Sequence, residues 1–258
     1  MVEVKNVEVF GLNRAVNAIN NSFNVGEIDT TIEVPEKRWG TAKSLGNNMD
    51  PHQSHDAFLK GILVTFDLKG NGAFMPELQR YHHFELVMSQ STMHSTKKFM
   101  ESDYDPFTKY VTDETKALVK KYYDQWIVAQ KNFVDWSGEA NNKEDQKTRE
   151  QLQWDTYEAF ERLIHNLPRG LELWVTCTTN YLQLKTIVIQ RAKHKQAEDW
   201  GSFIEFCYSL PRFRELCGFK DSKWDLENLF PLVYRKQNPW EVADQILKNS
   251  KEKSGFSR

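Results

Sequence analysis

The chain has 258 residues, of which 40% are hydrophobic and 27% charged, and its formal net charge is −2. This length allows one large domain or two small ones with a well-buried core. The small net charge gives no global sign of binding to nucleic acid or to an anionic membrane, and no apolar run reaches the roughly 18 residues that a membrane span needs.

In chain order, the first clear signal is the alternation of apolar and polar residues over 2–10, which predicts a strand. Asn13 is then expected to cap a short helix. Residues 59–69 give the clearest strand pattern of the chain. Apolar residues at helical spacing predict a helix over 74–94, with Pro76 in its first turn.

Helical patterns dominate the rest of the chain. Thr112 is expected to cap the first of these helices, which has apolar residues at three- and four-residue steps. That stripe consists of Leu118, Tyr122, Trp126 and Ala129. Helices are predicted over 112–136, 150–165, 178–195 and 199–210, with a last one beginning at Asn238-Pro239 and a frayed tail over 249–258. Few strands and long helices, without regular β-α alternation, predict an α+β (mixed α/β) fold.

Several common motifs are absent. The chain has no G-x-G-x-x-G and no G-x-x-x-x-G-K-S/T loop, so no standard dinucleotide or nucleoside triphosphate site is supported. It also lacks H-E-x-x-H, a zinc-type Cys/His cluster and a G-x-S-x-G elbow, and we expect no metal site. Its three cysteines have no C-x-x-C spacing, and residues 1–10 are too charged for a signal peptide, so we expect a reduced, cytoplasmic protein.

The segment YHHFELVMSQSTMH is rich in histidine and serine. His82 and His83 are adjacent, Arg80 lies just before them, and Ser91 follows. One interpretation is a core helix whose histidines are hydrogen-bonded structural groups. The other is a polar pocket for an anion or an aromatic cofactor, because His and Ser donate hydrogen bonds to phosphate and ring carbonyls and Arg80 adds charge.

This segment resembles the signature of the flavin-dependent thymidylate synthases. That signature reads Arg-His-Arg, two residues, Ser, one residue, Asn-Glu, one residue, Ser, one residue, Arg-Tyr. Its central His falls on His82 and its second Ser on Ser91, with no gap inside the motif. Tyr81, His83 and Met93 stand where the signature has Arg, and neither His nor Tyr reproduces the bidentate fork of a guanidinium.

A second block carries the resemblance more strongly. The family has Leu-Pro, nine residues, Thr-x-Asn, ten residues, Arg, and then His-x-Gln-x-Glu. The matching residues are Leu167-Pro168, Thr178, Asn180, Arg191, His194, Gln196 and Glu198, the last three after deletion of one residue behind Arg191. Upstream, His52 and Ser54 match a family His-x-Ser/Thr that precedes its strand.

The resemblance implies a small, mostly antiparallel sheet flanked by long helices, in a single domain over residues 1–248 with extra length around 112–150. Family members bind FAD, which NADPH reduces, and transfer a methylene group from a tetrahydrofolate to C5 of dUMP in sites between subunits of a homotetramer. The residues implied to bind the flavin are His52, Ser54, His82, His83, Asn180 and His194. Ser91 and Arg191 are implied as catalytic residues in the nucleotide site, which Arg80 would also line.

Other interpretations stay open at the level of single residues and of the whole chain. Asn180 is also a good plain helix cap, and the Ser91 hydroxyl can bond to its own backbone. The chain is therefore interpreted as a diverged thymidylate synthase, as a flavoenzyme that modifies another pyrimidine nucleotide, for instance by hydroxymethylation, or as a non-catalytic protein that keeps the scaffold.

Overall fold

The computed structural model describes residues 1–26, 32–47, 55–136 and 143–234. Backbone contacts divide the chain into two compact units. The first comprises residues 1–70, 77–88 and the chain from 175 onward, and the second comprises 71–76 and 89–174. His52, Ser54, the helix expected from Asn238 and the tail over 249–258 lie outside the described residues. The single domain over 1–248 stays a prediction.

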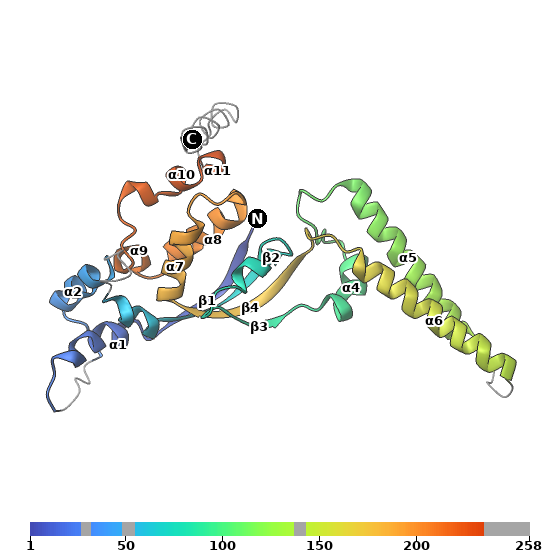
Figure 1. The fold of residues 1–258 in the computed structure, drawn as a ribbon, viewed down its shortest axis with the longest axis horizontal. Coiled ribbons are helices and arrows are strands. Elements are labelled where there is room, and N and C mark those ends of the chain that lie inside the picture. Colours follow the sequence, from blue (N-terminus) through green and yellow to red (C-terminus); the bar gives the residue numbers. More distant parts are fainter. Residues whose placement is uncertain (27–31, 48–54, 137–142, 235–258) are drawn as a thin grey trace, which may run out of the picture. The chain divides into compact units, whose positions relative to one another are not determined.

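A four-stranded sheet has the strand order β1-β2-β4-β3 (Figure 1). Its strands are β1 (Glu3–Phe10), β2 (Leu63–Asn71), β3 (Glu85–Ser89) and β4 (Glu172–Asn180). β1 runs antiparallel to β2, with a register shift between Lys5 and Glu8. The strand predicted over 2–10 is confirmed, as is the α+β fold with a small antiparallel sheet. The strand predicted over 59–69 begins only at Leu63, after a 3₁₀ helix.

The described helices of the first unit are α1 (Leu12–Asn17), α2 (Glu36–Gly46), α7 (Tyr181–Arg191), α8 (Ala197–Ser209), α9 (Phe213–Leu216), α10 (Leu226–Leu229) and α11 (Pro231–Tyr234). Among them, three have 11 or more residues (α2, α7 and α8) and the others are short. α1 begins after Gly11 rather than with an Asn13 cap, so that prediction is wrong. Gly11 has a φ of 76°, and a Cβ there would lie 2.5 Å from the Gly61 carbonyl oxygen, so the turn requires glycine.

Aromatic rings from strands and helices form the core of this unit. The Phe66 ring on β2 lies 4.7 Å from the Phe206 ring of α8 and 6.0 Å from the Phe84 ring. Phe203 lies within 6.4 Å of Phe66 and 6.0 Å of Trp200. The apolar side chains of β2 alternate with polar ones, so one face of the sheet packs on α8 while the other carries threonine and charged groups.

The helix predicted over residues 74–94 is wrong. Only Met75–Leu78 (α3) is helical before β3, and α4 begins at Thr92. The segment pairs with β4 instead, because the Gln90 amide donates to the Trp174 carbonyl at 2.9 Å. Long-range pairing therefore overrides the apolar spacing, and no helix face is shared by the histidines and serines. Pro76 does lie in the first turn of the short α3.

Like β3, the strand β4 was not predicted from the sequence patterns. Residues 178–195 were expected to be one helix, but β4 continues to Asn180 and α7 begins at Tyr181. Val175, Cys177 and Thr179 are buried in alternation, which is the period of a strand. The helix expected over 199–210 is close to the observed α8.

The described residues of the second unit form the helices α4 (Thr92–Glu101), α5 (Asp113–Asp135) and α6 (Lys143–His165), of which α5 and α6 lie side by side (Figure 1). The Thr112 cap is confirmed, because its hydroxyl accepts a hydrogen bond from the Thr115 amide at 3.3 Å. The predicted stripe is confirmed in part: Tyr122 and Trp126 pack against a core of Val119, Tyr123 and Leu163, whereas Leu118 is 42% exposed. α6 begins at Lys143 rather than at 150.

None of the helices within the described ranges combines the length and apolar character that crossing a bilayer demands. Among the same residues, no group of three or more His, Cys, Asp or Glu side chains is placed to hold a metal ion.

Candidate functional site

The candidate site is positioned by α7, which continues directly from β4. Asn180 is the shared residue: its side-chain Oδ1 accepts a hydrogen bond from the Gln183 amide at 2.9 Å and caps the helix. In the middle of α7, the buried Lys185 Nζ donates to Asp56 Oδ2 at 2.7 Å and to the Gly46 carbonyl at 2.9 Å. The Tyr181 amide also donates to the Ile62 carbonyl at 3.0 Å, so both the start and the middle of α7 are fixed to the rest of the unit.

Arg191 ends α7 inside a cluster of polar and aromatic groups. Its Nε donates to the Tyr81 hydroxyl at 2.7 Å and its Nη1 to Glu77 Oε2 at 2.5 Å. The guanidinium carbon lies 4.5 Å from the centre of the Trp200 ring, within cation–π range. Because only 15% of its side chain is exposed, Arg191 is not a solvated surface residue.

His194 joins the same cluster from the turn after α7. Its Nε2 lies 3.4 Å from Glu77 Oε2, and its Nδ1 accepts a hydrogen bond from the Gln196 amide at 3.2 Å. Its ring stands edge-on to Trp200 at 5.7 Å. Since Nδ1 is an acceptor here, the neutral imidazole carries its hydrogen on Nε2 and directs it at the Glu77 carboxylate.

Burial sets the electrostatics of this cluster. It lowers the pKa of His194, against the opposing effect of Glu77, and the positive charges of Arg191 and Lys195 lower that pKa further. Burial also raises the pKa of Tyr81, which the hydrogen bond and charge of Arg191 partly offset. At neutral pH the site therefore presents one guanidinium, one carboxylate, a neutral phenol and a neutral imidazole.

The cluster contains groups that the sequence patterns did not indicate. Glu77 and Trp200 were not expected in a site, and Tyr81 was noted only as a replacement for Arg. Glu77 is 114 positions from Arg191 in sequence, and no local pattern links residues that far apart. In the sequence, the aromatic residue type at positions 81 and 200 is the only sign that these residues could pack against an arginine.

Arg80, implied to line the nucleotide site, and His82 and His83, implied to bind the flavin, lie in this same unit but have different surroundings. Arg80, His82 and His83 are exposed on the turn before β3, and the two imidazole rings are 4.8 Å apart. The backbone of His83 is held from both sides, because its N–H donates to Gln183 Oε1 and its carbonyl accepts from the Thr179 hydroxyl. This turn is thereby tied to the start of α7.

Asn180 and Arg191 lie at opposite ends of one helix. α7 has 11 residues, so its ends are about 16 Å apart. The structure therefore brings Arg191 and His194 together, and places Asn180 beside the histidine turn instead. A ligand that contacted both groups would have to be extended.

Ser91 is the N-cap of α4, and its hydroxyl accepts a hydrogen bond from the His94 amide at 3.3 Å. It belongs to the second unit and Arg191 to the first. A shared role of Ser91 and Arg191 in catalysis therefore stays a prediction, as does any role of His52 and Ser54, which lie outside the described residues.

With this geometry in place, the chain can be compared with known proteins. No protein-family model matches it, and no curated protein matches it in sequence. Among solved structures, it is similar to thymidylate synthase X (ThyX) from Helicobacter pylori, solved with FAD and dUMP, with a TM-score of 0.52 and 15% identity over 86% of this chain and 100% of that one. The chain shares its fold with that enzyme.

Two further solved structures are more distantly similar. A second ThyX structure from Helicobacter pylori, complexed with FAD and dUMP, has a TM-score of 0.48 and 16% identity over 84% of this chain and 96% of that one. A UMP/dUMP methylase, PolB from Streptomyces cacaoi, bound with 5-Br dUMP, has a TM-score of 0.40 and 15% identity over 73% of this chain and 76% of that one.

The residues of the first unit fit a flavin nucleotide. Arg80 supplies a cation, and His82 and His83 supply ring N–H donors. The oxygens of a pyrophosphate and of ring carbonyls accept hydrogen bonds from such groups. Gln196 Oε1, two residues from His194, is a buried acceptor with no hydrogen-bond partner among the described residues. A ring N–H is the kind of donor that such an atom requires.

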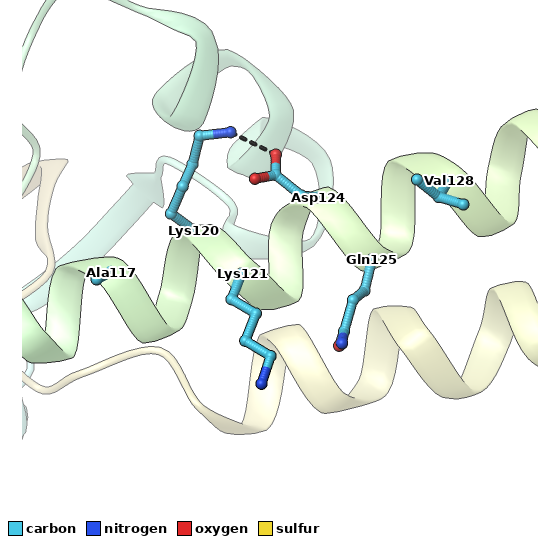
Figure 2. Close-up of a pocket in the computed structure, with 6 residues that line it drawn as sticks. All are labelled: Ala117, Lys120, Lys121, Asp124, Gln125 and Val128. Carbon is cyan, nitrogen blue, oxygen red and sulfur yellow. Dashed lines mark hydrogen bonds and ion pairs between the residues drawn. The ribbon is translucent and has the colours of Figure 1, made fainter.

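Two hollows in the second unit are poorer candidates. One, of about 600 Å³, follows a single face of α5 (Figure 2). It is lined by Ala117, Lys120, Lys121, Asp124, Gln125 and Val128, and Lys120 pairs with Asp124. The other, of about 340 Å³, lies between α5 and α6 and has no charged residue in its lining. Neither hollow is lined by a residue that was predicted to bind a cofactor or substrate or to act in catalysis, so we place the candidate site at Arg191.

Proposed function

We propose that this chain binds FAD and a pyrimidine nucleotide, and transfers a one-carbon unit from methylenetetrahydrofolate to C5 of dUMP with NADPH as reductant. One observation carries the proposal. Arg191 and His194, which the sequence resemblance singled out, meet in one half-buried cluster around Glu77. The fold shared with a thymidylate synthase solved with FAD and dUMP supports it.

The proposed chemistry assigns binding and orientation to the residues of this chain. C5 of uracil is a weak nucleophile, so the protein must polarise the pyrimidine ring and hold it against the one-carbon donor. Arg191 is suited to donate to the nucleotide, because two of its nitrogens are already fixed and little rotamer freedom is left to lose. A bound flavin would supply the redox chemistry.

The remaining predicted residues take supporting roles in this proposal. His82 and His83 contact the flavin from the turn before β3, with His52, Ser54 and His194 as further contacts, and Arg80 lines the nucleotide site. Asn180 uses Oδ1 for its cap, which leaves its side-chain NH₂ for the cofactor. Ser91 contacts the nucleotide. We further propose a cytoplasmic homotetramer in which several subunits complete each site.

The first test is the visible spectrum of the purified full-length chain. We expect a yellow protein with flavin absorbance, or one that acquires it when FAD is added. A colourless protein that fails to bind added FAD refutes the proposal. Rescue of a thymidine-requiring bacterial strain then tests the reaction itself.

Arg191→Ala tests the nucleotide site. We expect it to abolish the rescue, because loss of a hydrogen-bonded charged group costs about 1.5–3 kcal/mol, or roughly 10- to 100-fold in affinity. Arg212→Ala is the matched control, since Arg212 also pairs with a glutamate and stacks on a tryptophan ring. Rescue by Arg191→Ala as strong as that by the parent would show that the site is wrongly placed.

The second candidate is a flavoenzyme that modifies a different pyrimidine nucleotide, for instance by hydroxymethylation. The observation that favours it is the position of Tyr81, which fills space beside Arg191 where the resembling family has a further Arg. A yellow protein that binds dUMP but fails the rescue supports this candidate. Mass spectrometry of the nucleotide product then identifies the group added.

A further inference from the structure

We infer that Glu77 is a positioning residue for Arg191: it fixes the guanidinium and, by pairing with its charge, directs the site toward a neutral ring carbonyl rather than a phosphate. The ligand half of this inference rests on the proposed function, whereas the positioning half does not.

Three contacts fix the orientation of the guanidinium. Glu77 Oε2 accepts from Nη1 at 2.5 Å, and the Tyr81 hydroxyl accepts from Nε at 2.7 Å. The guanidinium carbon also lies 4.5 Å from the centre of the fully buried Trp200 ring. Nη2 is the guanidinium nitrogen that has no hydrogen-bond partner among the described residues, so it is the nitrogen positioned to donate to a ligand.

The charge of Glu77 limits what Arg191 can bind. A guanidinium 2.5 Å from a carboxylate is largely neutralised, and the pair is only 15% and 27% exposed, so water screens it weakly. A phosphate approaching Nη2 would meet the negative charge of Glu77 as well. A neutral carbonyl oxygen accepts the same hydrogen bond without that repulsion.

His194 shares the same carboxylate oxygen. Its Nε2 is 3.4 Å from Glu77 Oε2, so Glu77 holds the turn after α7 as well as the end of α7. Glu77 comes from α3, a separate segment of the chain. A single carboxylate therefore organises both residues that the proposed function requires.

The chain supplies a matched control for this arrangement. Arg212 Nε pairs with Glu215 Oε2 at 3.0 Å, and its guanidinium lies 3.9 Å from the Trp39 ring centre. The Glu215 side chain is 26% exposed, against 27% for Glu77. Glu215→Gln thus removes an equally exposed, arginine-paired carboxylate.

The first experiment needs no ligand. In ¹⁵N spectra of the full-length chain, the Arg191 Nε–H signal is assigned by its loss in Arg191→Lys, and its hydrogen exchange is measured. We expect exchange in Glu77→Gln to be at least about tenfold faster, because the Nε–H no longer stays on Tyr81. Glu77→Asp should restore part of the protection, and Glu215→Gln should leave it unchanged.

Unchanged Arg191 exchange in Glu77→Gln overturns the positioning role. Circular dichroism shows whether each variant is folded. If Glu77→Gln is unfolded, the exchange rate of Arg191 in Glu77→Asp is compared with that of the parent instead. In that case exchange in Glu77→Asp equal to the parent overturns the role, and faster exchange in a folded protein supports it.

The second experiment measures dUMP and deoxyuridine affinities of the FAD-loaded parent and Glu77→Gln by calorimetry. We expect the Glu77→Gln variant to lose affinity for both ligands by the same factor, about tenfold, because the two ligands share the pyrimidine ring and differ in the phosphate. A change confined to dUMP overturns the preference for a ring carbonyl. A parent that binds neither ligand refutes the proposed function and this preference together, while the exchange result still decides the role of Glu77.

Discussion

Replacing Lys185 by methionine should destabilise the first unit strongly. The Lys185 side chain is 4% exposed, and its ammonium donates both to Asp56 Oδ2 and to the Gly46 carbonyl. Methionine has a similar length but no charge, so the variant leaves the Asp56 carboxylate, itself only 10% exposed, without this partner. Removing one member of a buried ion pair costs about 3–5 kcal/mol, which is a large part of the 5–15 kcal/mol that stabilises a typical domain.

Urea denaturation followed by circular dichroism measures this loss. Lys120→Met is the matched control, because Lys120 pairs with Asp124 on the surface of α5, where an exposed pair is worth about 0–1 kcal/mol. The double variant Asp56→Asn/Lys185→Met should recover at least about 1 kcal/mol, since it leaves no unpaired charge. If Lys185→Met lowers the free energy of unfolding by no more than Lys120→Met does, the buried pair of Lys185 and Asp56 does not stabilise the unit as argued.

Three further predictions concern the pH response, the α7 cap and the α2 helix. Because burial lowers the pKa of His194 below its ordinary value of about 6.5, the folded chain takes up this proton less readily than the unfolded chain. The free energy of unfolding should therefore fall as the pH drops below about 6.5, and denaturation of His194→Gln should show a shallower fall. Asn180→Asp keeps a capping oxygen, so the melting temperature of this variant should be near that of the parent. Because it lacks the side-chain NH₂ proposed to contact the cofactor, its affinity for FAD should fall. An affinity for FAD equal to that of the parent would assign Asn180 to the helix cap alone. Gly46→Ala places a Cβ 1.7 Å from the Leu216 carbonyl oxygen and should lower the melting temperature. Gly40→Ala has no atom within 4 Å of its Cβ and should raise the melting temperature, because a glycine within a helix costs about 1 kcal/mol. The opposite order of melting temperatures would contradict the packing of α2.

Local signals predicted the parts of the fold that depend on neighbours in sequence. β1 follows from alternation, and the start of α5 follows from the Thr112 cap, whose hydrogen bond spans three residues. β3 was not predicted, because its apolar residues also fit helical spacing. β4 was not predicted either, and its last residues, from Thr178, were included in an expected helix. What decides between strand and helix is pairing between Gln90 and Trp174, 84 residues apart, and a short window contains no trace of it.

The candidate site divides in the same way. Arg191 and His194 were indicated by the resemblance, and Asn180 proved to be a helix cap, which the residue type alone made plausible. Glu77 lies in a segment that was predicted to continue as a helix, so its direction could not be inferred. α3 in fact ends at Leu78, and Glu77 pairs with Arg191 114 positions away.

The direct passage from β4 into α7 also determines where this chain tolerates a change in length. One residue inserted before Tyr181 would rotate α7 by about 100° and carry Lys185 and Arg191 away from their partners. Arg191 is the last residue of α7, however, and the turn that follows includes Lys193 at a φ of 63°. The one-residue deletion that the family resemblance requires falls in this turn. The spacing from β4 to Arg191 is thus constrained by helical geometry, whereas an insertion or deletion just after Arg191 can be absorbed by the turn.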